Sequence, residues 1–212
     1  MSKPATNKRS NRTIDQRTIN YRAIDDPALI AVLASPVRQE IADTLAALGG
    51  EASASELALE LGRHADGLYY HLNVLCKARL IVEQDGHKED ERRYRLAGAA
   101  PLPLRLAYRV DSAPHVAALR KFAHGLLQVA QKDFAGALET PGVVTDGPLR
   151  ELWAARNKAW LSADELAEVN ALLERLCELM SRPRTDERDR MLSCLFVLAP
   201  HVALPKRRGE AQ

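Results

Sequence analysis

Apolar residues recur at helical spacing through the first half of the chain. Val37, Ile41 and Leu45 follow one another at intervals of four, which places them on one side of a helix. Three other segments show the same period, and residues typical of helix boundaries flank them, such as Asp26 before Pro27. The sequence therefore predicts helices over about residues 27–33, 36–48, 53–61 and 65–78.

The pattern changes from the helical period to alternation at Leu80. Residues 80–84 (LIVEQ) and 92–96 (RRYRL) have the length and composition of strands, and Asp85-Gly86 between them is a typical turn. This arrangement predicts a β-hairpin with a polar tip. Four helices and a hairpin in so short a stretch indicate one compact unit, over residues 27–98.

The second half of the chain returns to the helical period. Apolar stripes predict a long helix over residues 112–139 and shorter helices over 149–160 and 163–181, and residues 191–200 resemble a buried strand. The last of these helices carries apolar residues spaced alternately by three and four, a heptad-like seam. That seam can pack within one chain or against a second copy, and we expect a contact between subunits. Its members are Leu166, Val169, Leu173, Leu176 and Met180.

Composition limits the class of protein. The chain has 212 residues, of which 46% are hydrophobic and 27% charged, the balance of a soluble globular protein. No apolar run approaches the roughly 20 residues of a membrane span, and the polar start lacks the apolar core of a secretory signal. We therefore expect no membrane contact and a cytoplasmic location. Cys76, Cys177 and Cys194 are too scattered for a disulfide framework and read as small core residues.

Charge is distributed unevenly along the chain. Residues 1–26 have three more basic than acidic side chains, residues 27–98 three more acidic than basic ones, and residues 99–212 an excess of two basic ones. We interpret residues 1–26 as a flexible basic arm that either touches nucleic acid or stays solvated. Residues 99–212 are expected to form a helical region that serves dimerisation or the sensing of an effector. The order of the predicted helices and strands gives the fold class. It is mainly α with a small β-hairpin wing, a winged helix-turn-helix followed by a helical C-terminal region.

The predicted helix over residues 65–78 has one buried side and one open side. Leu68, Leu72 and Leu75 point inward, and a tight turn joins this helix to the one before it. A helix exposed in this way fits the major groove of DNA, and its N-terminal residues reach the base edges first. The alternative is that the tyrosines cover an ordinary protein interface. The residues that we expect at the DNA are Arg63, His64, Ala65, Asp66, Gly67, Tyr69, Tyr70 and Asn73.

The hairpin offers a second contact with DNA. Lys88, Arg92 and Arg93 crowd one small ribbon, which can lie along a phosphate backbone. Alternation places Arg93 and Arg95 on one face and Arg92 on the other. The acidic residues 89–91 at the tip oppose such a contact, so a plain charged hairpin is the alternative.

These motifs resemble a known family when they are taken in order. The opening SPVRQEI, the helix SELA, the helix YYHLNVL and the strand RLIV are similar to the winged helix-turn-helix of ArsR-type bacterial regulators, over about residues 28–98. The resemblance implies a dimer on a pseudo-palindromic operator, usually a repressor that a signal releases. The metal-sensing members carry cysteines in the third helix or His and Asp ligands in the last, whereas SELALELG has no cysteine. His115, His124 and His201 also lack acidic partners, so we expect no metal and no cofactor.

Two questions remain after the resemblance: whether the chain is an enzyme, and whether it binds an effector. The chain contains no GxGxxG, P-loop, HExxH or GxSxG motif, so we expect no enzyme. Trp153 and Trp160 lie seven residues apart on one face of a predicted helix, where they line an effector pocket or belong to the core or an interface. The sequence thus predicts a regulator that binds double-stranded DNA sequence-specifically, and the resemblance implies a dimeric repressor. Whether an unidentified small-molecule effector binds it stays open. The alternative is a protein–protein interaction module on a winged-helix scaffold.

Overall fold

A computed structural model describes residues 22–85, 92–98, 104–182 and 184–201. The helices in this part of the chain are α1 (Pro27–Leu33), α2 (Pro36–Ala47), α3 (Ala54–Glu60), α4 (Asp66–Lys77), α5 (Ala113–Glu139) and α6 (Ala163–Met180). The strands are β1 (Arg22–Ile24), β2 (Glu51–Ser53), β3 (Ile81–Asp85), β4 (Arg92–Leu96) and β5 (Leu104–Leu106). The fold is mainly helical, and the predicted winged helix-turn-helix with a helical C-terminal region is confirmed.

Local chemistry explains where the first helices begin and end. The Asp26 carboxylate accepts a hydrogen bond from the Ala28 amide at 2.8 Å and caps α1, while Pro27 supplies a fixed φ at its first position. Gly49 and Gly50 follow α2 with φ values of 92° and 95°, a conformation that glycine adopts without strain. The predicted boundaries of both helices are thus confirmed within one residue.

The winged helix-turn-helix surrounds one hydrophobic core. Leu68, Leu72 and Leu75 of α4 are fully buried, as the helical spacing predicts, together with Ile41 and Leu45 of α2. The predicted hairpin is present, with Ile81 opposite Leu96 and Val82 opposite Arg95. Strand β2, which the sequence did not indicate, pairs antiparallel with β4 and gives a sheet of order β2-β4-β3.

A second, parallel strand pair ties the start of the described chain to the segment after the wing. β1 pairs with β5, with Ile24 opposite Leu106, and both of these side chains are buried. Arg109 forms an ion pair with Asp25 beside the pair. The expectation of a flexible arm up to residue 26 is therefore wrong for residues 22–24, while residues 1–21 lie outside the described part.

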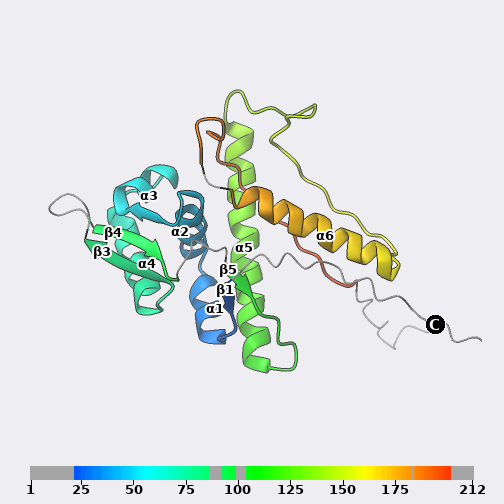
Figure 1. The fold of residues 1–212 in the computed structure, drawn as a ribbon, viewed down its shortest axis with the longest axis horizontal. Helices are drawn as coiled ribbons and strands as arrows, with labels where there is room; N and C mark the ends of the chain where they lie inside the picture. The colour runs from blue at the N-terminus through cyan, green and yellow to red at the C-terminus, as the bar shows by residue number, and fades with distance from the viewer. Residues whose placement is uncertain (1–21, 86–91, 99–103, 183, 202–212) are drawn as a thin grey trace, which may run out of the picture.

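Helix α5 is the axis of the molecule. It packs along α1 and α2, with the sheet, α3 and α4 on one side of it and α6 reaching away on the other (Figure 1). Gly125 of α5 is buried against the α1–α2 turn, and a Cβ atom there would lie 2.3 Å from the Ala34 carbonyl oxygen. The Gln39 Nε2 atom donates to the Phe122 carbonyl at 3.2 Å nearby.

The C-terminal part follows the sequence prediction in α5 and α6, and differs from it in the segments after each of them. The predicted helix over residues 149–160 is wrong, because this segment is irregular. The Glu151 amide donates instead to the Val144 carbonyl at 2.7 Å, and its carboxylate pairs with Arg190 at 2.6 Å. The predicted strand over residues 191–200 is also wrong: the segment is irregular, and none of the described strands pairs with it, as a strand requires.

Among the described residues, every helix is either too short or too polar to cross a bilayer.

Gly125 provides a test of the packing between α5 and the α1–α2 turn. We expect Gly125→Ala to lower the free energy of unfolding by about 1–3 kcal/mol, since the new methyl group overlaps the Ala34 carbonyl. Gly136→Ala in the same helix meets open space and should raise it by about 0.5–1 kcal/mol. Urea unfolding of both variants measures the difference. Equal shifts of the two midpoints in the same direction would contradict the close approach.

Candidate nucleic-acid interface

Helix α4 presents a continuous exposed side next to the turn that precedes it. Its buried leucines fix its rotation, so the opposite side faces solvent. Tyr70 is 69% exposed and Tyr69 44%, both large for aromatic side chains in a folded unit. Of the residues predicted to face DNA, the exposed ones are Arg63, His64, Asp66, Gly67, Tyr69, Tyr70 and Asn73, and Ala65 is half-buried. The structure therefore brings these residues to one surface. Lys77, one turn beyond Asn73, is also exposed there, and the sequence analysis did not single it out.

Arg63 is not free at this surface, because it bonds to a buried carboxylate. Its Nη2 atom donates to Glu40 Oε2 of α2 at 2.8 Å, and the side chain of Glu40 is only 7% exposed. The second carboxylate oxygen of Glu40 binds Lys132 of α5. One carboxylate therefore links the turn before α4 to the long helix α5, and Arg63 is oriented by that link.

Glu40 was missed by the sequence analysis, although a signal for it exists. The inward stripe of α2 runs through Val37, Ile41 and Leu45, and Glu40 lies three residues after Val37 on the same side. A charged residue at such a position is buried and needs partners. Arg63 and Lys132 are those partners, but the sequence alone does not say which cations come near.

Tyr70 and His71 of α4 form an aromatic pair next to this surface. Tyr70 meets the His71 ring edge-on, with centroids 5.2 Å apart and ring planes at 78°. Burial, and then the nearby Arg38 and Arg63 cations, lower the pKa of His71. The imidazole is therefore neutral at physiological pH, and it braces Tyr70 without adding charge to the surface.

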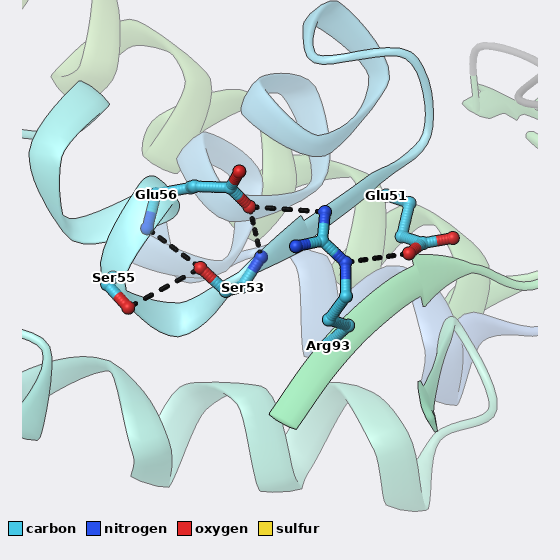
Figure 2. A network of polar contacts seen from close by, with 5 residues as sticks. All are labelled: Glu51, Ser53, Ser55, Glu56 and Arg93. Carbon is cyan, nitrogen blue, oxygen red and sulfur yellow. Dashed lines mark hydrogen bonds and ion pairs between the residues drawn. The ribbon is translucent and has the colours of Figure 1, made fainter. Parts of the chain in front are cut away.

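The wing arginines differ in what they bind. Figure 2 shows Arg93 reaching across the sheet, where its Nε donates to Glu51 at 2.7 Å and its Nη2 lies 3.3 Å from Glu56. Glu56 also accepts from the Ser53 amide at 2.7 Å in the capping box that starts α3. This backbone hydrogen bond is the main cause that lowers the pKa of Glu56, and Arg93 contributes to it.

Arg93 therefore holds the wing to α3 rather than pointing at a ligand. Arg95 is also occupied, since its Nη1 donates to the Gly98 carbonyl at 2.9 Å. Arg92 is the more exposed cation, with its Nε 3.4 Å from Glu83 in a loose surface pair. The geometry favours Arg92 over Arg93 for a phosphate contact. Lys88, the remaining predicted wing residue, lies outside the described residues.

The tryptophans expected at an effector pocket do not form one. Trp160 is fully exposed, and Trp153 is largely exposed with the Arg150 guanidinium 3.8 Å from its ring centroid. The reason is that the predicted helix that would have aligned them is absent. In the described ranges, no three His, Cys, Asp or Glu side chains are grouped so that they could hold a metal ion.

Replacement of the linking carboxylate tests its role in stability. We expect Glu40→Gln to lower the free energy of unfolding by about 1.5 kcal/mol, because Arg63 and Lys132 lose a charged acceptor. Hydrogen bonds to charged groups contribute about 1.5–3 kcal/mol. We take the low end of that range because the side chains of Arg63 and Lys132 are 34% and 52% exposed. Glu178→Gln, which removes an exposed pair with Arg175 on α6, is the control and should change it by less than about 0.5 kcal/mol. If Glu40→Gln and Glu178→Gln lowered the free energy of unfolding equally in denaturant titrations, the contacts of Glu40 would contribute no more to stability than an exposed ion pair does.

Comparisons with known proteins support a helix-turn-helix in one region of the chain. A search of curated protein sequences finds no match to the chain. One similar solved structure is that of an organohalide-sensing transcriptional regulator in its 2,4-dichlorophenol-bound form, at 16% identity and a TM-score of 0.25. That similarity covers 73% of this chain and 63% of the other, so the chain spans less than two thirds of that protein. A family model described as a helix-turn-helix domain matches residues 33–84, from the end of α1 to β3. Residues 33–84 of this chain are therefore a helix-turn-helix domain.

Proposed function

We propose that this protein is a homodimeric transcriptional repressor that binds double-stranded DNA sequence-specifically through α4. The observation that carries the proposal is the exposed side of α4, where Tyr69, Tyr70 and Asn73 stand clear of the core on a helix held by three buried leucines. An asparagine amide and tyrosine hydroxyls can donate and accept hydrogen bonds at base edges and phosphates.

We assign the contacts with DNA phosphates to the polar and basic side chains around α4. Arg92 on the wing and Lys77 at the end of α4 are exposed cations, and His64 in the turn before α4 offers a ring N–H donor. Arg63 contributes in a different way, because its bond to Glu40 leaves other guanidinium N–H groups for a phosphate. Local cations suffice even though residues 27–98 carry a net negative charge, since phosphate neutralisation acts at short range.

A dimer is supported by helix α6. Its 18 residues include no buried side chain, and its seam residues Leu166 and Met180 are both 44% exposed. An amphipathic helix gains most of its stability from covering its apolar side. In the described part of the chain this side is only partly covered, because Val169, Leu173 and Leu176 are half-buried and both ends of the seam are exposed. A second copy supplies an identical apolar stripe that would complete the cover. Two-fold symmetry would also present two α4 helices to two half-sites of one operator.

Repression with release by a small molecule is the regulatory mode that the ArsR-type resemblance implies. A bound dimer covers its operator, and a ligand that prefers the unbound form lowers the affinity for DNA.

The DNA-binding part of the proposal is tested by two kinds of variant. Tyr70→Ala and Asn73→Ala should each weaken the selected duplex by about 1–3 kcal/mol and relax sequence preference. Arg92→Ala should weaken all duplexes alike and flatten the log–log salt slope by about one unit per subunit. Arg175→Ala, an exposed cation on α6, is the control.

The measurement is titration of the full chain with duplexes selected from a random pool, over a salt series. Unchanged affinity of the Tyr70, Asn73 and Arg92 variants at every salt concentration would exclude this surface as the DNA contact. A protein partner for the same surface would then be the better explanation.

The dimer is tested at the α6 seam. Leu173→Asp places a charge in the stripe and should convert a dimer into a monomer in sedimentation velocity at micromolar concentration, because an unpaired buried carboxylate opposes association. Leu59→Asp changes an exposed leucine of α3 in the same way and should leave the dimer intact. A monomeric parent protein, or a dimeric Leu173→Asp variant, would contradict this interface.

A further inference from the structure

A hollow of about 490 Å³ lies between the end of α1, the start of α2 and the middle of α5. Ala31, Ala34 and Ser35 form the small side chains of its wall on α1 and the turn that follows. Four long or cyclic basic side chains complete it: Arg38, Arg120, Lys121 and His124. The volume falls within the range of small-molecule sites, about 300–1,000 Å³.

The charges around the hollow are not balanced. No carboxylate lines it, and none of Arg38, Arg120 and Lys121 forms an ion pair with another described residue. Arg38 is held in place because its Nε donates to the Val32 carbonyl, which leaves its terminal nitrogens as donors. Three cations around one hollow raise the local concentration of anions.

The wall between the cations selects among anions. The methyl groups of Ala31 and Ala34 offer apolar contact but no hydrogen bond, so they favour a ligand with an apolar body. Arginine recognises a carboxylate through paired N–H···O bonds, and the hollow is lined by Arg38 of α2 and Arg120 of α5. We propose that this hollow binds a small organic anion, a carboxylate on an aromatic or branched apolar body.

The hollow adjoins the contacts that join α5 to the helix-turn-helix. Gly125 of α5 follows His124 of the lining and lies against Ala34, which lines the opposite wall. Gln39, next to Arg38, donates to Phe122 of α5. The next residue, Glu40, binds both Lys132 of α5 and Arg63 of the turn before α4. A ligand bound in this open hollow therefore touches both α2 and α5 beside the contacts that orient the recognition turn.

This geometry assigns the anion a regulatory role, and that part of the inference rests on the proposed function. Displacement of α2 relative to α5 moves Glu40 and with it Arg63. The anion then lowers the affinity for the operator, and by linkage the operator lowers the affinity for the anion by the same factor.

Binding is tested first without DNA, so that the result does not depend on the proposed function. The full chain is titrated with benzoate, phenylacetate and cyclohexanecarboxylate at millimolar concentrations, each beside its uncharged amide, by calorimetry and ligand-observed NMR. We expect at least one carboxylate to bind and its amide to bind at least about tenfold more weakly, because the charge-assisted bonds are lost.

Paired variants locate the site. Arg120→Ala combined with Lys121→Ala should weaken the carboxylate at least about tenfold. Arg156→Ala combined with Lys158→Ala removes the same two charges from an exposed segment away from the hollow and should leave binding unchanged. The proposal is overturned if no carboxylate binds, if an amide binds equally well, or if the hollow variant retains full affinity.

The selected operator duplex forms the second arm of the experiment. A bound carboxylate should reduce operator affinity in the parent protein and have no effect in the Arg120→Ala/Lys121→Ala variant. If no anion binds but this variant loses affinity for all duplexes with a flatter salt slope, the cations contact DNA phosphates and the small-molecule site is refuted. If carboxylates bind but no duplex does, the site stands and the proposed function fails.

Discussion

The packing of α5 against the α1–α2 turn is the constraint on which the arrangement of the molecule depends. A helix can approach a carbonyl as closely as α5 approaches Ala34 only where it carries no Cβ atom, and Gly125 meets that condition. Two polar side chains of α2 then bind α5 directly: Gln39 at the Phe122 carbonyl and Glu40 at Lys132. The helix-turn-helix is therefore fixed relative to α5 by shape and by hydrogen bonds, within one turn of α2.

Much of the helix-turn-helix was predictable because its signals are local. The capping box at Ser53, the prolines that open α1 and α2 and the apolar stripe of α4 each act within a few residues, so the sequence states them directly. Strand β2 and the β1–β5 pair could not be predicted in the same way. Each strand is only three residues long and exists because of a partner far away in the chain.

The residues of the candidate site likewise divide into those that a local pattern predicts and those that depend on distant partners. The exposed face of α4 follows from helical periodicity, so Tyr69, Tyr70 and Asn73 were found. Alternation alone could not say that Arg93 bonds to Glu51 and Glu56 across the sheet while Arg92 stays exposed. The prediction that Trp153 and Trp160 share one helical face is wrong for a related reason. Their spacing has meaning only on a helix, and the hydrogen bonds of Glu151 hold that segment in another conformation.

The parallel pair of β1 and β5 brings the entry and the exit of the winged helix-turn-helix to one point. Ile24 lies opposite Leu106, although about eighty residues of chain separate them, and the Asp25–Arg109 ion pair lies alongside. A folded unit whose two ends meet can be joined to another scaffold without stretching it, which is the geometry that tolerates domain insertion. The same junction means that a pull between the two ends loads the hydrogen bonds of β1 and β5 first. Tension that enters along the backbone at these two ends therefore meets the strand pair before it reaches the core around α2 and α4.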